Sequence, residues 1–352
     1  MVGENSRFTA IPPGAILPGS MPDFRIFIRS DSRYVLWARE GNTVTLEQLN
    51  KLAAGSNEVY IDVEDGFKYD QYLEAHLGDI LKKDGASCQQ KAEVFSRVTN
   101  KVIEQTFVVS QSGGGLPQDV IGRVKTVVKN ALVFIAETRT LEALSKIIGH
   151  DYKTYEHATK VLWLVTLFLK ANPDILEEIE PNCVHFTDDE NSLLLEQCGV
   201  AAILHDIGKV FVPAEILNKN GPLNEVEWEI IKRHPLGSLA LLLDTDIPVF
   251  VKRAVLHHHE NFTGNGGYPM GVVGNSIHPL ARVIKIADVF DAMTSKRPYK
   301  DAMSPSETVR IMAGIPDNGN GSKNRDSGMR HCFDEKYLRK FIVLLGKLPV
   351  AR

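Results

Sequence analysis

The pattern of hydrophobic and polar positions changes along the chain and separates two kinds of region. Residues 24–40 hold two alternating, β-prone segments around a polar turn, and residues 58–63 add another strand-like segment. Between them, Thr45 occupies an N-cap position ahead of apolar residues at helical spacing. This order predicts a small α+β domain over residues 22–80. The prolines and glycines of residues 1–21 predict a flexible leader.

Beyond the α+β domain the apolar positions recur with helical period. A Gly- and Pro-containing break at residues 112–117 separates two predicted helices, so we expect a helical connector over residues 81–136. After residue 151 no alternating segment remains. The pattern therefore predicts a mainly α protein whose residues 137–352 form an all-helical domain. No motif with chemistry precedes this domain, which favours a regulatory or dimerising role for the N-terminal part.

Three predicted helices of the C-terminal part each carry an ionisable side chain on an apolar stripe. These side chains are His157, His205 and Asp288. A buried ionisable group costs free energy unless it is paired or bound to a metal. A single histidine in this position is usually a hydrogen-bonded core residue, but three groups from separate helices indicate a shared interior site.

The candidate metal ligands are imidazoles and carboxylates, with no thiolate. They are His157, His205, Asp206, His234, His258, His259 and Asp288. This donor set suits iron, manganese or zinc in a catalytic site. The set exceeds what one ion needs and Asp206 could bridge two ions, so we predict a dinuclear site that acts on a phosphoryl group. Lys209 lies one turn later on the same side and could neutralise phosphate charge.

Composition and charge narrow the range of functions. The net charge of −4 gives no reason to expect a nucleic acid polymer as partner. The longest apolar run, residues 161–169, is too short to span a bilayer, and the N-terminus lacks the order of a secretory signal. The four cysteines are scattered, which favours reduced thiols in a cytoplasmic protein.

Several ordered motifs together resemble one known family. They are HDIGK (205–209), IKRHP (231–235), HHE (258–260), GYP (267–269) and ARVIKIADVFDAMTSKRPYK (281–300). The stretch from about residue 137 to residue 345 is similar to the HD-GYP family. These are bacterial phosphodiesterases of the HD superfamily that hydrolyse cyclic di-GMP.

The resemblance implies roles for individual residues. The positions matching the family's metal ligands are His157, His205, Asp206, His234, His258, His259 and Asp288, with Asp206 bridging. Those matching substrate contacts are Lys209, Arg297 and Lys300, and those matching the signature loop that shapes the site are Gly267, Tyr268 and Pro269. Asp206 and Lys209 are the residues implied in the chemistry. His257 matches no ligand and is expected to be solvated or to lie behind the ligands.

The sequence departs from the family pattern in three places. Lys153 stands where some members have a glutamate for a third metal, so we expect two ions. The loop at residues 263–267 is one residue longer than usual, and residues 317–331 look like an inserted mobile loop rich in Gly, Asn and Ser.

The implied function is a phosphodiesterase with two divalent ions, iron favoured over manganese. A metal-bound hydroxide would open cyclic di-GMP to linear pGpG and continue in part to GMP. Two alternatives stay open: a weakly catalytic module that binds cyclic di-GMP or a GGDEF-domain protein, and a phosphohydrolase for another cyclic dinucleotide. The resemblance also suggests GGDEF-domain proteins as partners through the signature loop, and the N-terminal part leaves room for a homodimer.

Overall fold

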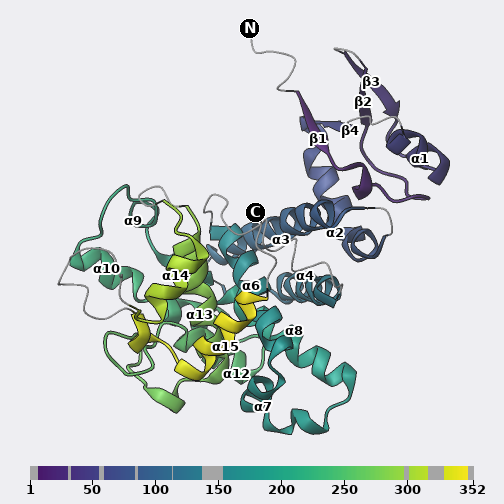
Figure 1. The fold of residues 1–352 in the computed structure, drawn as a ribbon. Helices are drawn as coiled ribbons and strands as arrows, with labels where there is room; N and C mark the ends of the chain where they lie inside the picture. Colours follow the sequence, from purple (N-terminus) through teal and green to yellow (C-terminus); the bar gives the residue numbers. More distant parts are fainter. Residues whose placement is uncertain are drawn as a thin grey trace. The chain divides into compact units, whose positions relative to one another are not determined.

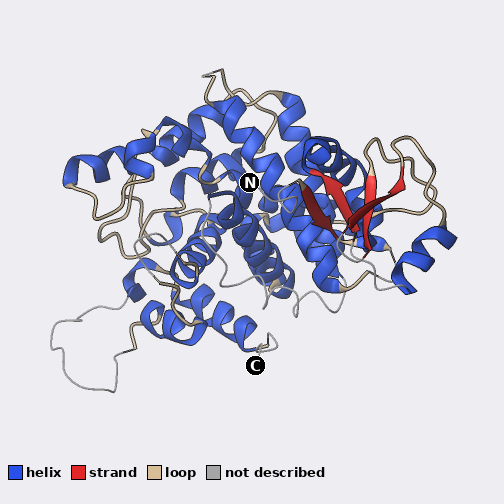
Figure 2. Ribbon diagram, turned by 90° about the horizontal axis from the view of Figure 1, so that it is seen from above, coloured by secondary structure: helices blue, strands red, loops and turns tan. Residues whose placement is uncertain are grey.

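The computed structural model describes residues 7–30, 33–54, 59–83, 86–112, 114–136, 154–296, 301–315 and 329–347. The chain divides into two compact units, residues 1–101 and 102–352 (Figure 1). The described strands gather in a single sheet, and helices make up the rest of the regular structure (Figure 2). The predicted mainly α fold is therefore confirmed. None of the described helices has the length and apolar character needed to cross a bilayer.

The N-terminal unit is built on an antiparallel sheet with strand order β1-β4-β2-β3. Its elements are β1 (Phe8–Ile11), β2 (Ile26–Ser30), β3 (Arg33–Ala38), α1 (Leu46–Ala54), β4 (Val59–Asp62) and α2 (Gly66–Lys82). The predicted hairpin is β2 and β3, which pair from Ile26 with Ala38 to Ser30 with Arg33. Thr45 caps α1 as predicted, because its Oγ1 accepts the N–H of Gln48 at 3.2 Å.

The expectation of a flexible leader is wrong for the described residues 7–21. Residues 8–11 form β1, which pairs with β4 from Phe8 opposite Asp62 to Ile11 opposite Val59. Arg7 also donates to the Asp62 carboxylate at 2.9 Å. The partner strand lies about fifty residues further along the chain, so the order of this short segment depends on pairing that local sequence signals do not reveal.

The predicted helical connector consists of α3 (Cys88–Ser110) and α4 (Gln118–Ala136). The connector is not a separate compact unit, because the division between the two units falls inside α3, between residues 101 and 102. Helix α4 packs against α6 and α8 of the C-terminal unit, where the rings of Phe134 and Trp163 lie 5.3 Å apart. The C-terminal unit therefore begins earlier than the expected boundary at residue 137, since the apolar stripe of α4 is buried against it.

The C-terminal unit is all-helical in its described part. Its longer elements are α6 (Thr154–Ala171), α7 (Pro173–Ile179), α8 (Asp188–Leu204), α10 (Glu225–Ile231), α11 (His234–Leu242), α12 (Val249–His257), α13 (Pro279–Thr294), α14 (Pro305–Met312) and α15 (Glu335–Gly346). Helix α13 is buried along most of its length and packs against α6, α7, α12, α14 and α15. Fully buried aromatic residues such as Phe168, Phe290 and Phe341 fill the space around it. The helices that carry the predicted ligands are thus held by one apolar core.

Candidate metal centre

The structure brings all seven predicted ligands together in the C-terminal unit. They form two groups: Asp206, His234, His258 and His259, and His157, His205 and Asp288. Within each group the potential ligand atoms lie within 4.8 Å of one another. The side chains come from α6, the end of α8, the start of α11, the end of α12 and the middle of α13. Helix packing therefore assembles the site from segments more than a hundred residues apart.

The orientation of three imidazoles is set by their own helical turns. In His205, His234 and His258, Nδ1 lies 2.7, 2.8 and 2.6 Å from the carbonyl oxygen three residues earlier in the chain. A carbonyl oxygen only accepts, so Nδ1 carries the proton in each ring. The Nε2 atom of each neutral ring is then left with its lone pair, which is the form that binds a metal.

The buried polar atoms of the site fit a cation better than they fit one another. The Nε2 atoms of His234 and His258 lie 3.3 Å apart, so two lone pairs meet at short range. His205 Nε2 and Asp206 Oδ1 are buried and have no hydrogen-bond partner among the described residues. Such atoms cost free energy when they stay unsatisfied. Divalent ions would satisfy them, and the nitrogen and carboxylate donors suit iron, manganese or zinc.

The two carboxylate oxygens of Asp206 face different ligand groups. Oδ1 lies 3.0 Å from His234 Nε2 and 3.8 Å from His258 Nε2. Oδ2 lies 3.4 Å from His205 Nε2 and 3.8 Å from His157 Nε2. Asp206 thus directs one carboxylate oxygen toward each ligand group. This is the arrangement that a bridging carboxylate requires.

His157 is oriented by a residue that the sequence reasoning missed. Its Nε2 lies 3.1 Å from Asp288 Oδ1, and its Nδ1 lies 2.7 Å from Asp291 Oδ2. Ser295 donates to Asp291 Oδ1 at 3.0 Å, and Lys160 donates to Ser295 at 3.0 Å. A carboxylate behind a ligating histidine fixes the tautomer and the ring plane. The available signal was the position of Asp291, three residues after Asp288 on the same helix.

Burial and neighbouring charges set the protonation of the ligands. Burial alone raises the pKa of Asp206, but Lys209 and His205 hold that pKa well below its ordinary value. Burial also raises the pKa of Asp288, but the hydrogen bond with His157 and the charges of the neighbouring histidines together hold that pKa well below its ordinary value. Burial lowers the pKa of His258 to about 4 and also lowers that of His259. Neutral imidazoles beside ionised carboxylates are the protonation states that metal binding needs.

Comparison with known proteins identifies the domain that holds this site. Residues 177–317 match the HD domain family. The match covers less than half of the chain, and this stretch is similar to an HD domain. A protein from Bdellovibrio bacteriovorus described as an HDG"Y"P protein has the same fold, with a TM-score of 0.60 over 96% of this chain and 99% of that one, at 16% identity. Together with the ordered motifs, these matches confirm the resemblance to the HD-GYP family.

Two curated relatives extend the comparison. A cyclic di-GMP phosphodiesterase of Pseudomonas aeruginosa is 39% identical over 212 residues, which make up 60% of this chain and 44% of the relative. A 3′3′-cGAMP-specific phosphodiesterase of Vibrio cholerae is 42% identical over 113 residues, or 32% of this chain and 26% of the relative. The chain thus spans less than half the length of these relatives.

The glycine of the HDIGK motif is required by close packing. A Cβ atom on Gly208 would lie 2.1 Å from the carbonyl oxygen of His234 and 2.3 Å from the amide nitrogen of Ser238. The Ser238 hydroxyl accepts the N–H of Gly208 at 2.8 Å and donates to the carbonyl oxygen of His205 at 2.9 Å. This contact fixes the turn with His205 and Asp206 against the helix that begins at His234.

The loop that carries the GYP motif lies against one side of the ligands. The ring of Tyr268 stacks on the ring of His259, with the ring centroids 4.7 Å apart. Outside this loop, Lys209 Nζ lies 2.5 Å from Asp206 Oδ2. A Cβ atom on Gly267 would lie 2.3 Å from the amide nitrogen of Asn261, so the loop passes too close to the backbone for any other residue. The Tyr268–Pro269 peptide bond is cis. Lys209 and Tyr268 thus lie beside ligands, and their contact with substrate stays a prediction.

Two further residues, both missed in the sequence, hold the GYP loop. Glu260 Oε1 accepts the N–H groups of Met270 at 2.6 Å and Gly271 at 3.0 Å. Lys285 of α13 donates to the carbonyl oxygen of His259 at 3.1 Å and to the side chain of Asn261 at 2.6 Å. The loop is therefore tied to the same chain segment that supplies His258 and His259. His258 and His259 belong to one ligand group beside this loop.

Some predicted positions fall outside the described residues. These are Arg297 and Lys300, expected to contact substrate, Lys153, expected to exclude a third ion, and residues 317–328 of the expected inserted loop. His257 belongs to neither ligand group, in agreement with the motif comparison. It is 7% exposed, so the solvated position considered for it is wrong.

Proposed function

We propose that this chain is a metal-dependent phosphodiesterase that hydrolyses cyclic di-GMP. The observation that carries the proposal is the convergence of seven histidine and aspartate side chains in two groups around Asp206. The names of curated relatives, including the cyclic di-GMP phosphodiesterase of Pseudomonas aeruginosa, support the choice of substrate. A complete ligand set also argues against a module that only binds the nucleotide.

Each ligand group would hold one divalent ion, iron in first place and manganese as the alternative. His234, His258 and His259 would hold one ion, and His157, His205 and Asp288 the other, with Asp206 shared between them. When bound, such ions activate water and neutralise charge on phosphoryl oxygens. The opening of the ring would give linear pGpG, and a second cleavage would give GMP.

The protein's own side chains would bind and orient the substrate. Lys209 is 19% exposed at its side chain, so its ammonium group can reach both Asp206 and a phosphate on the open side. Tyr268, stacked on His259, would shape that side together with Gly267 and Pro269. Asp291 would keep the Nδ1 proton of His157 in place. We retain Arg297 and Lys300 as substrate contacts on the family resemblance.

A second candidate substrate is 3′3′-cGAMP. The Vibrio cholerae relative that is 42% identical over 113 residues favours it, because its name states that specificity. We further propose that the N-terminal unit is regulatory, that GGDEF-domain proteins meet the GYP loop, that the chain forms a homodimer and that it works in the cytoplasm.

Turnover of both dinucleotides by one protein preparation tests the proposal. The protein is purified without oxygen and assayed with iron under reducing conditions and, separately, with manganese, and the products are separated by chromatography. We expect pGpG from cyclic di-GMP, and no product from the Asp206→Ala variant. A preparation with two bound ions and no product from either dinucleotide would contradict the proposed activity.

A further inference from the structure

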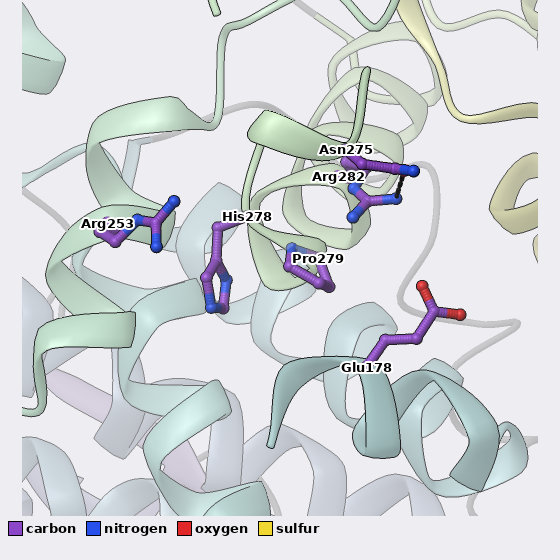
Figure 3. Close-up of a pocket in the computed structure, with 6 residues that line it drawn as sticks. All are labelled: Glu178, Arg253, Asn275, His278, Pro279 and Arg282. Atoms are coloured by element: carbon purple, nitrogen blue, oxygen red, sulfur yellow. Dashed lines mark hydrogen bonds between the residues drawn. The ribbon is translucent and has the colours of Figure 1, made fainter. Parts of the chain in front are cut away.

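A pocket lies in the C-terminal unit at the N-terminal end of α13. Its volume is about 430 Å³, and it is lined by Glu178, Arg253, Asn275, His278, Pro279 and Arg282. Figure 3 shows Arg253 and Glu178 at opposite sides of this view, with His278 and Pro279 between them. None of the lining residues belongs to either ligand group. Pockets for small molecules typically measure about 300–1,000 Å³.

Two of the charged lining side chains already have partners of opposite charge. Arg282 donates to the Asp334 carboxylate at 2.7 Å, and this pair is buried. Arg282 also donates to Asn275 Oδ1 at 3.4 Å, as the dashed line in Figure 3 shows. Glu178 accepts from Lys336 at 2.5 Å and from the hydroxyl group of Tyr337 at 2.7 Å. These charges are therefore compensated within the protein.

Arg253 is left with an uncompensated charge. No hydrogen bond or ion pair joins it to a residue in the described part of the chain, and its side chain is exposed. Its charge lowers the pKa of His257 and of His278, two neighbours that are themselves potential cations. An arginine with five donors and no acceptor presents an empty site for a phosphate or carboxylate group.

His278 adds an apolar wall to the pocket. It is 8% exposed, and its ring lies parallel to that of Phe250 at a centroid distance of 6.0 Å. Its Nδ1 accepts the N–H of Leu280, which caps α13. Burial and the neighbouring Arg253 lower its pKa to about 4, so the ring is neutral at pH 7. One cation, one amide and one flat neutral ring together suit a ligand with an anionic group and an apolar body.

We propose that this pocket is a second ligand site, separate from the metal centre, that binds a nucleotide-sized phosphomonoester through Arg253. The phosphate group would take the guanidinium donors of Arg253, which match two phosphate oxygens at once. The body of the ligand would lie against His278 and Pro279. This site does not depend on the proposed function, because it uses none of the residues assigned to hydrolysis.

The position of the pocket links it to the metal centre. Arg253 lies on α12, which ends at His257 just before the ligands His258 and His259. Arg282 lies on α13 six residues before Asp288, which is about 9 Å along a helix. Helices α12 and α13 pack against each other. A ligand in the pocket would therefore rest on two of the helices that position ligands of the metal centre.

Binding of guanosine 5′-monophosphate to the metal-loaded protein tests the proposal. Equilibrium dialysis is run on the wild type, on Arg253→Ala and on Arg339→Ala. The last is a matched control, because Arg339 is an exposed arginine on α15 that pairs with Glu335, and neither residue lines the pocket. Inorganic phosphate and guanosine serve as competitors, and metal content is measured on every sample. Circular dichroism checks that each variant is folded.

We expect binding that weakens at least about tenfold in Arg253→Ala, the scale of one lost charge-assisted hydrogen bond. Arg339→Ala should bind as the wild type does, metal content should not change, and phosphate should compete while guanosine should not. Equal binding by wild type and Arg253→Ala, or competition by guanosine alone, would overturn the proposal. A catalytically inactive protein that still shows Arg253-dependent binding would overturn the proposed function and leave this site intact.

Discussion

Replacing Asp291 by alanine should weaken metal binding although Asp291 is not itself a proposed ligand. The carboxylate is 2% exposed and lies 2.7 Å from His157 Nδ1 and 3.0 Å from Ser295 Oγ. Alanine removes both contacts, so the ring of His157 loses the acceptor that fixes its tautomer and its plane. Loss of a partner behind a ligand typically lowers metal affinity about 10–100-fold. Loss of a buried hydrogen bond to a charged group costs about 1.5–3 kcal/mol, which is the same scale.

Competition with a chelator measures this effect directly, without relying on turnover. Two further variants calibrate it. Asp291→Asn keeps an oxygen acceptor for His157 and should lose less affinity than Asp291→Ala. Ser295→Ala removes one donor to Asp291 but leaves the contact with His157, so its affinity should stay close to that of the wild type. If folded Asp291→Ala holds metal as tightly as the wild type, the orienting role assigned to Asp291 is wrong.

The other predictions concern the bridge, the packing of the motif and the response to pH. Asp206→Ala should abolish turnover and lower the metal content from two ions per chain, measured by elemental analysis, while circular dichroism shows the helices intact. Near-normal turnover with two ions bound would show that the shared carboxylate is not needed. Gly208→Ala should lower the free energy of unfolding by about 1–3 kcal/mol or more, because its Cβ atom would meet backbone atoms at 2.1 and 2.3 Å. Gly122→Ala on α4, where nothing lies within 4 Å, should instead stabilise by about 0.5–1 kcal/mol, and urea unfolding of both variants distinguishes packing from a general effect of alanine. The pKa of His278 is about 4 in the folded protein, which is below its unfolded value of about 6.5. Between these two values the unfolded chain binds a proton that the folded protein does not, so the free energy of unfolding is fully present above pH 6.5 and falls as the pH drops from 6.5 to 4. His278→Asn should remove that part of the pH dependence, up to about 3 kcal/mol in urea unfolding at pH 7 and pH 4.5, and an unchanged slope would mean that His278 does not titrate in this range.

The helices of the C-terminal unit and the seven clustered side chains followed from the sequence because they depend on local periodicity and on motif spacing. A histidine within an apolar stripe, such as His157, indicates both that the segment is a helix and that the histidine side chain is buried. Other features depend on contacts between distant segments. Strand β1 is ordered by pairing with β4, and α4 joins the C-terminal unit because its apolar stripe meets α6 and α8. Neither effect is visible in a short window of sequence.

Within the site, the residues behind the ligands were the ones that sequence reasoning missed. Asp291 looks like any polar residue near a helix end until α6 places His157 2.7 Å away. The roles of Glu260 and Lys285 likewise depend on the folded GYP loop, in which Glu260 accepts the N–H of Met270 and Lys285 donates to Asn261. Metal ligands are histidines and carboxylates and can be recognised in the sequence by residue type. Residues that support the ligands are recognised only by their distance from the ligands in the folded chain.

The hydrogen bonds from His205, His234 and His258 to carbonyl oxygens three residues earlier have a consequence for how the protein acquires its metals. Each imidazole ring is oriented by the helical turn that contains it, so the side chain loses its rotational freedom when the helices form. Little reorganisation remains for the moment at which an ion arrives. Loading and removal should therefore be reversible exchange on a rigid scaffold, with one ion able to replace another of similar size and no refolding between them.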